Sequence, residues 1–124
     1  MNKLQSLIGK TVVEVKGNRF DDDFVMVTKC GLVYTLYHNQ DCCEHVYLED
    51  IIGDNDDLLG EIVLAEEVTN RDIEPPNEQS YADSYTWTFY RLATKKGLVV
   101  LRFFGSSNGY YSEEVSLTIT ELEK

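Results

Sequence analysis

The chain has 124 residues, and its 22 acidic against 11 basic side chains give a formal net charge of −11. This length predicts one domain, so we expect residues 1–124 to fold as a single unit. Nucleic-acid binding requires a basic surface, and an anionic membrane would repel so negative a chain. The charge therefore excludes direct binding to nucleic acid or to such a membrane. It favours a basic protein surface or a cation as partner, with solubility alone as the alternative.

The cellular compartment can be predicted from signal-peptide and membrane-helix patterns and from the cysteines. No apolar run precedes a cleavage site near the start, and no stretch reaches the roughly 20 apolar residues of a membrane helix. We therefore expect a cytoplasmic protein. The three cysteines, Cys30, Cys42 and Cys43, fit a reducing compartment. We predict three free thiols, because a bridge between the neighbours Cys42 and Cys43 would be strained.

Runs of β-branched and aromatic residues, bounded by turn residues, predict consecutive strands. In chain order the first of them cover residues 11–16, 24–29, 32–38, 43–52 and 61–69. Residues 43–52 also allow a short helical turn, and 61–69 fit either a strand or two helical turns. Residues 70–83 form the one long polar break, which we interpret as a loop within the domain.

After this loop come strands at 84–94, 98–104 and 110–120, joined by Lys95-Lys96-Gly97 and by Asn108-Gly109. Asn-Gly is the strongest short hairpin signal, and Cys30-Gly31 marks another tight turn. Residues 105–109 also spell the G-x-S-x-G of a hydrolase nucleophile elbow, but that elbow must lead into a helix. A β pattern follows here, so we interpret these residues as a turn.

Short connections between the strands favour an antiparallel meander of roughly seven or eight strands. We therefore predict a mostly β, single-domain fold, curled or stacked into a small sandwich or a partly open barrel, with an α+β arrangement as the alternative. Any helix should be short, one or two in number, and confined to the first ten residues or to 55–68.

The acidic residues are concentrated in one stretch, which predicts a binding face. Residues 30–70 contain no lysine or arginine and supply −10 of the net charge. The candidate contacts of this acidic face are Asp41, Glu44, Glu49, Asp50, Asp54, Asp56 and Asp57. Such a face would dock onto a basic surface of another protein.

The same stretch holds side chains that could bind metal or act as nucleophiles. His38, Asp41 and Cys43 could converge on a metal ion, although adjacent cysteines on a strand point to opposite faces. The alternative is one buried cysteine that packs as a small hydrophobic residue. A cysteine nucleophile is disfavoured, because the surrounding acids would raise its pKa. We therefore predict no cofactor, no resident metal and no catalytic residue.

Aromatic residues in the second half suggest a second kind of site. Tyr85, Trp87 and Phe89 share one side of their strand, where we expect the core. A mixed surface of tyrosine, arginine and asparagine could instead stack a planar ligand. The candidates for this aromatic and polar site are Trp87, Tyr90, Arg102, Asn108, Tyr110 and Tyr111.

Several motifs resemble a small protein family found in bacteriophages and their hosts, over roughly residues 30–116. The motifs are the segments 38–44 (HNQDCCE), 49–54 (EDIIGD), 57–60 (DLLG), 84–90 (SYTWTFY) and 107–112 (SNGYYS), together with Arg102. His45 stands where a small polar residue is expected, a departure from the pattern. The resemblance implies a phage context but no mechanism, and small acidic phage proteins often counter host defence.

These observations favour a non-enzymatic acidic protein that neutralises a host defence component by docking its acidic face on a basic protein surface. The alternative is sequestration of a small nucleotide-like signal in the aromatic and polar pocket. A metal-dependent enzyme built on the segment 41–44 (DCCE) is the third hypothesis. The sequence leaves the partner and the oligomeric state open.

Overall fold

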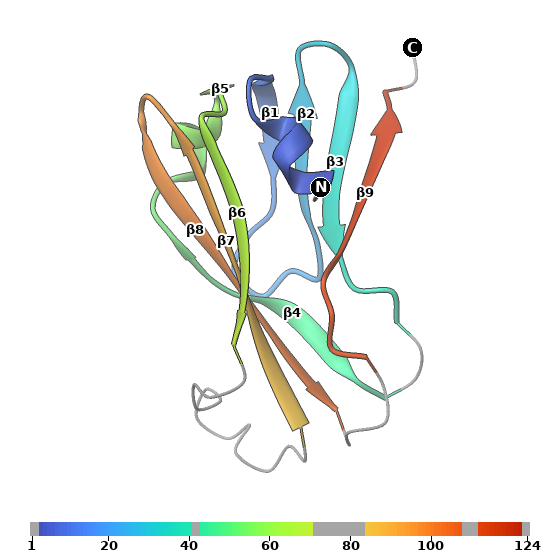
Figure 1. Cartoon of the computed structure of the whole chain (residues 1–124). Coiled ribbons are helices and arrows are strands. Elements are labelled where there is room, and N and C mark those ends of the chain that lie inside the picture. The colour runs from blue at the N-terminus through green and yellow to red at the C-terminus, as the bar shows by residue number, and fades with distance from the viewer. Residues whose placement is uncertain (1–2, 41–42, 71–83, 108–111, 123–124) are drawn as a thin grey trace.

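We describe a computed structural model of the chain, for residues 3–40, 43–70, 84–107 and 112–122. Most of these residues lie in strands of two antiparallel sheets, which form a sandwich that is not closed into a barrel (Figure 1). The predicted mostly β sandwich is thus confirmed. The elements are η1 (Lys3–Leu7), β1 (Thr11–Lys16), β2 (Phe24–Thr28), β3 (Leu32–Tyr37), β4 (His45–Ile52), η2 (Asn55–Leu58), β5 (Gly60–Glu61), β6 (Leu64–Asn70), β7 (Ser84–Thr94), β8 (Gly97–Ser107) and β9 (Ser116–Glu121).

The strand order combines local hairpins with four connections that cross between the two sheets, after β3, β4, β5 and β8. The five-stranded sheet has the order β5-β1-β2-β3-β9, and the four-stranded sheet has the order β4-β8-β7-β6. Two predicted hairpins are confirmed. Gly31 adopts φ 92° between β2 and β3, and Thr94 pairs with Gly97 across Lys95 and Lys96. A positive φ favours glycine, which explains Gly31 in this tight turn.

The predicted hairpin between residues 98–104 and 110–120 is wrong. β8 is paired on both sides, with β4 and β7, so no edge remains for the following strand. The last strand therefore crosses to the other sheet and pairs with β3. It also begins later than predicted, at Ser116, and Gly105–Ser107 belong to β8 instead of a turn. Asn108 and Gly109 lie outside the described residues.

The core lies between the two sheets. The inner face of the five-stranded sheet contributes Val12, Phe24, Met26, Tyr34 and Leu36, and the four-stranded sheet contributes Leu48, Tyr90, Leu92, Val99, Leu101 and Phe103. Burial of this apolar surface is the main force that holds the sheets together.

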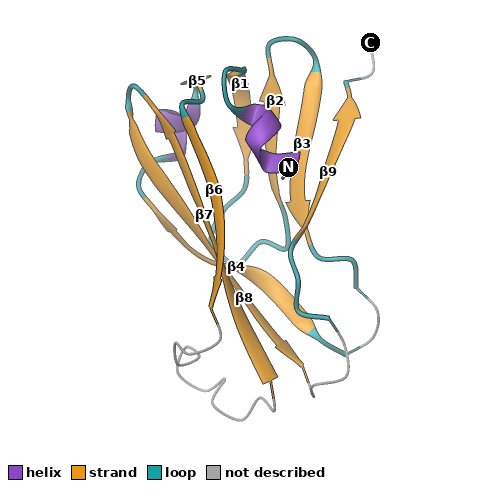
Figure 2. Cartoon of the chain, in the orientation of Figure 1, coloured by secondary structure: helices purple, strands orange, loops and turns teal. Residues whose placement is uncertain are grey.

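Two short 3-10 helices fill gaps at the margins of the sandwich (Figure 2). Leu4 and Leu7 of η1 and Leu58 of η2 are fully buried in the same core. The hydroxyls of Ser6 and Tyr34 are 2.7 Å apart, which ties η1 to β3. Both helices lie where the sequence predicted short helices. The alternative helical interpretation of 61–69 is wrong, because β6 occupies most of that segment.

Candidate functional site

An aromatic strip crosses the outer face of the four-stranded sheet. We use this name for His45, Tyr47, Phe104, Trp87 and Phe89, with Phe20 and Tyr85 at its sides. Neighbouring ring centroids are 4.7 Å apart for His45 and Tyr47, 6.1 Å for Tyr47 and Phe104, 4.9 Å for Phe104 and Trp87, and 6.1 Å for Trp87 and Phe89. Phe20 adds a contact of 6.4 Å with Tyr47, and Tyr85 one of 6.3 Å with Phe104.

The register of the strands builds this strip. Tyr47 lies directly opposite Phe104, and Phe104 directly opposite Trp87. Residues opposite one another in antiparallel strands share a face, so three aromatic side chains line up across three strands. Alternation sends their neighbours Phe103 and Tyr90 inward to the core. The aromatic face on which Trp87 lies is therefore turned away from the main core between the sheets. Trp87 and Phe104 are nevertheless buried, at 1% and 0% exposed, so the expected burial of Trp87 is confirmed and only its place between the sheets is not.

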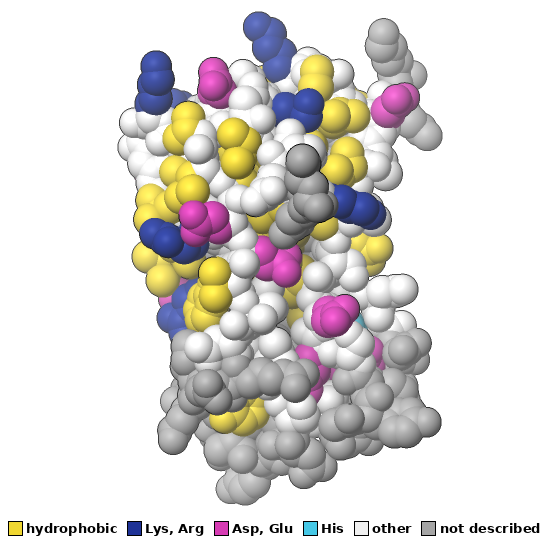
Figure 3. All heavy atoms as spheres, in the orientation of Figure 1, with side chains coloured by type: hydrophobic (Ala, Val, Ile, Leu, Met, Phe, Trp, Pro, Cys, Tyr) yellow, Lys and Arg dark blue, Asp and Glu magenta, His cyan; other side chains and the backbone are white. Residues whose placement is uncertain are grey.

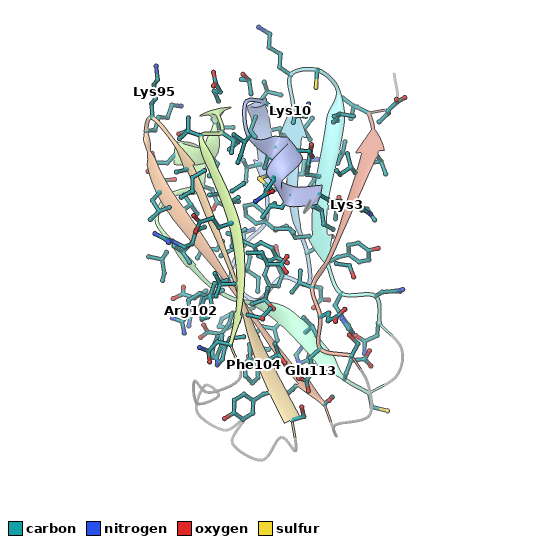
Figure 4. All side chains as sticks on the ribbon, viewed as in Figure 1. Lys3, Lys10, Lys95, Arg102, Phe104 and Glu113 are labelled. Carbon is teal, nitrogen blue, oxygen red and sulfur yellow. The ribbon has the colours of Figure 1, made fainter. Side chains whose placement is uncertain are left out.

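Arg102 extends the strip with a side chain that is 30% exposed. Its Cζ lies 4.9 Å from the ring centroid of Trp87, a cation–π contact. Its terminal nitrogens lie 3.8 Å from Glu49 and 4.0 Å from Asp50, too far for hydrogen bonds. Its buried Nε has no hydrogen-bond partner among the described residues. Arg102 points away from the five-stranded sheet, beside Phe104 (Figure 4).

Glu49 lies at an irregularity in β4, where the register shifts between Leu48 and Asp50. Such a bulge redirects a side chain, and Glu49 lies between two arginines, with Arg19 at 3.9 Å and Arg102 at 3.8 Å. Two positive charges thus meet the two negative charges of Glu49 and Asp50. The strip is locally neutral on a molecule of net charge −11.

Phe20 projects from the loop between β1 and β2 and is 62% exposed. Its φ of 77° places a bulky residue in the left-handed region, which L side chains rarely adopt. Backbone hydrogen bonds hold this conformation, because Phe20 N–H donates to Leu48 and Leu48 N–H donates to Asp21. Arg19 lies over the ring, with Cζ 4.6 Å from its centroid. A strained backbone that presents an apolar side chain to solvent is typical of functional sites.

The phenol of Tyr47 remains neutral within this site. Burial raises its pKa above the ordinary value for tyrosine, and the Glu49 carboxylate raises it further, while Arg19 opposes the shift. The hydroxyl therefore stays protonated at neutral pH and can both donate and accept a hydrogen bond.

A cluster of polar side chains lies at the His45 end of the aromatic strip, around a buried pair of His38 and Glu44. The two side chains are 4% and 0% exposed, and His38 Nε2 is 2.7 Å from Glu44 Oε2. His38 Nδ1 is 2.7 Å from the carbonyl oxygen of Glu114, which can only accept, so Nδ1 donates. Gln40 Nε2 donates to Glu44 Oε1 at 3.2 Å. Imidazolium with carboxylate, and neutral imidazole with carboxylic acid, both leave the pair without net charge.

A cavity of about 410 Å³ opens beside this pair. It is lined by Asp22, His38, Gln40, Glu44, His45 and Val46. Because His45 lines the cavity and its ring contacts that of Tyr47, the cavity adjoins the aromatic strip. Its volume falls within the range of small-molecule sites, about 300–1,000 Å³.

The comparisons with known proteins give a family and no function. A protein-family model described as a domain of unknown function (DUF7448) matches residues 5–117. The chain belongs to the DUF7448 family. No curated protein and no solved structure matches it. The matched residues include every described member of the aromatic strip and of the His38 pair, so both lie within the DUF7448 domain.

The structure separates the acidic residues that the sequence grouped as one face of this DUF7448 domain. Glu44 is buried against His38, and Glu49 and Asp50 lie beside Arg102. The other three described members lie at η2, where Asp54 accepts a hydrogen bond from Asp56 N–H as the N-cap, and Asp57 is partly buried. Asp41 lies outside the described residues. The candidates therefore form separate groups.

The candidate metal ligands have other partners. Both ring nitrogens of His38 are hydrogen-bonded, and Cys43 is disulfide-bonded. Neither side chain is free to bind a metal in this structure, and Asp41 is not described. No group of three or more histidine, cysteine or acidic side chains suited to a metal occurs in the described part of the chain. The prediction of three free thiols is contradicted by Cys43. Cys30 is a free thiol whose pKa is lowered, mainly by a hydrogen bond with Thr28.

The second set of candidates is divided as well. Trp87 and Arg102 are brought together, but Tyr90 faces the opposite side of β7 and is buried in the core. Asn108, Tyr110 and Tyr111 lie outside the described residues. Four residues of this site were not predicted from the sequence, namely Arg19, Phe20, Tyr47 and Phe104. The alternation of Tyr47 and Phe104 with core residues could have identified two of them, but the pairing of β4 with β8 had no sequence signal.

Proposed function

We propose that this DUF7448 domain is a non-enzymatic binding protein that docks onto a partner protein through the aromatic strip. The supporting observation is the continuous series of ring contacts from His45 to Phe89, with Arg102 stacked on Trp87. Tryptophan, tyrosine and arginine are the residues enriched at energetic hot spots of protein interfaces. Trp87 and Phe104 are buried, so the partner would contact the exposed Phe20 and Arg102, while the buried rings hold these two side chains rigidly and lower the entropic cost of binding.

The charges around the strip favour a basic partner. The centre is neutral, while Asp21, Asp22 and Asp23 follow Phe20 directly and are all exposed. A neutral, aromatic centre with a charged rim is the usual anatomy of a specific interface. The negative rim and the net charge of −11 would speed encounter with a positively charged surface. The partner should therefore present an apolar patch within a basic surface.

The biological setting of this proposal comes from the resemblance to phage proteins. A host defence component with a basic surface, neutralised in the host cytoplasm, is the partner that this setting suggests. No helix within the described residues is long and apolar enough to cross a membrane.

The second candidate function is capture of a small, nucleotide-like planar ligand. The observation that favours it is the cavity of about 410 Å³ beside the strip, where His45 could stack against a ring. The acidic lining by Asp22 and Glu44 disfavours a bound phosphate group. The cavity therefore suits a neutral or cationic ring better than a polyphosphate.

One experiment separates these functions. The purified chain is used to capture partners from a host lysate, and small molecules that copurify are identified by mass spectrometry. Arg102→Ala should abolish capture of a protein partner, whereas Arg91→Ala, on the same strand pair but outside the strip, should retain it. A copurified small molecule that is lost when His45 is changed to Ala would favour the second function. Equal capture by Arg102→Ala and the unchanged chain would contradict the first.

A further inference from the structure

The strand β9 is an edge strand of the five-stranded sheet, and one of its two sides is unpaired among the described residues. β3 pairs with β9 along its whole length, and no other element of the described chain lies beyond β9 (Figure 1). Leu122 N–H donates to the Gly31 carbonyl at 2.7 Å, which fixes the phase of the ladder. Because hydrogen-bonded and non-bonded positions alternate, Ser116, Thr118 and Thr120 bond to β3. The N–H and C=O groups of Leu117, Ile119 and Glu121 therefore point away from the sheet.

The other sheet edges have features that protect them from pairing. β5 has only two residues. The backbone of Phe20 and Asp21 covers the middle of β4 through hydrogen bonds with Leu48. β6 carries two exposed carboxylates, Glu66 and Glu67. Short strands, covering segments and edge charges are the devices by which natural sheets avoid strand addition.

β9 has none of these devices within its six residues Ser116–Glu121, apart from the glutamate at its end. Lysine, arginine, proline and any register shift are absent from it. Leu117 and Ile119 pack against the core but stay partly exposed, because no described strand lies on their other side. Charged side chains of both signs are scattered over the face drawn in Figure 3, whereas β9 carries a single charged residue, Glu121.

We propose that β9 pairs with β9 of a second copy of this chain, antiparallel about a two-fold axis at Thr118. This register places Leu117 opposite Ile119 of the second copy, with both backbones in hydrogen-bonded positions. Thr118 then faces its own counterpart in a non-hydrogen-bonded pair, where side chains approach most closely. Thr–Thr pairs across strands are favourable.

The position of Glu121 is compatible with this antiparallel register about Thr118. Glu121 falls opposite Val115 of the second copy, about six residues from the other Glu121, or roughly 20 Å at the rise of a strand. The two glutamates therefore do not meet. The result is one continuous sheet of ten strands, formed from the five strands of each copy. An isologous contact of this kind closes on itself and gives a dimer that does not extend into a fibre.

A pair of like charges at the axis provides the sharpest test. Sedimentation equilibrium of the whole chain should show a dimer. Thr118→Lys places two ammonium groups opposite each other at the axis, so it should give a monomer, as should Thr118→Glu. A mixture of the two variants should restore a heterodimer. Thr35→Lys is the matched control, because Thr35 is the partner of Thr118 on β3 and lies one strand inward. It should leave the dimer intact.

Cross-linking gives a second measurement that does not depend on stability. In a Cys30→Ser background, Thr118→Cys should form a disulfide-linked dimer under mild oxidation, and Thr35→Cys should not. Circular dichroism verifies that each variant is folded. A monomeric native chain, a Thr118→Lys variant that remains dimeric, or equal cross-linking of Thr118→Cys and Thr35→Cys would each overturn the proposal.

Discussion

The guanidinium carbon of Arg102 lies 4.9 Å from the ring centroid of Trp87, on strands that are adjacent in the four-stranded sheet. Trp87 is only 1% exposed, so the arginine forms part of its cover. An arginine that is stacked on an aromatic ring and lacks short hydrogen bonds at its terminal nitrogens keeps those N–H donors available for a partner, although the Nε of Arg102 is buried. This pair therefore marks the centre of the proposed interface.

Arg102→Ala should weaken partner binding by about 2 kcal/mol or more, roughly thirtyfold in Kd, as expected for a hot-spot residue. Arg102→Lys should recover little of this loss, because an ammonium group cannot stack in the same way. Isothermal titration calorimetry with the captured partner measures both effects. Arg91→Ala should change Kd by less than a factor of about three, since the exposed Arg91–Glu66 pair contributes little. Equal losses for Arg102 and Arg91 would place the interface elsewhere.

Phe20→Gly should separate binding from stability. Glycine adopts a φ of 77° without the cost of about 1–2 kcal/mol that an L side chain incurs there. We therefore expect the free energy of unfolding to change by no more than about 1 kcal/mol, because relief of strain offsets the lost ring contacts and the greater freedom of the unfolded chain. Partner binding should fall strongly. Urea denaturation and calorimetry measure the two quantities, and unchanged binding would show that Phe20 has no role in docking.

The strands and the two helical segments were predictable because their signals are local. Alternation and turn residues predicted a strand at the place of each long strand, and Gly31 marked a turn that needs a positive φ. The pairing of β4 with β8 and of β9 with β3 was not predictable, because partners far apart in the sequence leave no local pattern. The Asn108-Gly109 signal even favoured the wrong neighbour for β8.

The candidate site was only partly predictable for the same reason. The sequence singled out Trp87 and Arg102 and predicted that Trp87 is buried, but an alternating pattern does not say which face lies between the sheets. It combined seven acidic residues by proximity in sequence. The fold then distributed the described ones among a buried pair, an arginine cluster and a helix cap. Phe20 could not be predicted from the sequence, because its backbone conformation depends on hydrogen bonds with Leu48 of β4, which is distant in the sequence.

The acidic rim should act mainly on the rate of association. Changing Asp21, Asp22 and Asp23 together to asparagine should slow association with a basic partner, and the effect should shrink as salt is raised, because the Debye length falls from about 10 Å at 0.1 M to about 3 Å at 1 M. The matched control changes Asp54, Asp56 and Asp57 to asparagine, an equal loss of charge at η2 that keeps a side chain able to cap the helix. Surface plasmon resonance at several salt concentrations compares the two. A larger effect of the η2 variant would favour docking through that turn.

The His38–Glu44 pair should be a major contributor to stability. Glu44→Ala leaves a buried imidazole without its partner, so we expect a loss of about 3–5 kcal/mol in the free energy of unfolding. Glu44→Gln should cost less, because the side-chain amide can donate to Nε2 of a neutral His38 whose proton is on Nδ1. Thermal and urea denaturation measure these values. A loss below about 1 kcal/mol for Glu44→Ala would show that the pair is not closely coupled to the fold.

Tyr90 gives a prediction that depends on pH. Burial, and then the Glu67 carboxylate, raise the pKa of Tyr90 above its ordinary value. Below about pH 10 the phenol is protonated in both the folded and the unfolded chain, so it adds no pH dependence there. Above this pH the unfolded chain releases the proton and the folded chain retains it. The free energy of unfolding should therefore fall with rising pH, by up to about 1.4 kcal/mol per pH unit from this residue.

Tyr90→Phe should remove that component. At neutral pH the variant should lie within about 1 kcal/mol of the unchanged chain, because a single hydrogen bond such as that of the phenol with Glu67 contributes about that much to stability. Urea denaturation from about pH 8 to about pH 11 measures the difference between the two proteins, which cancels the other titrating groups. Because Tyr90 faces the core and Trp87 faces outward, Tyr90→Phe should also leave partner binding unchanged. A variant that loses stability in parallel with the unchanged chain above about pH 10, or that loses the partner, would contradict this assignment of Tyr90.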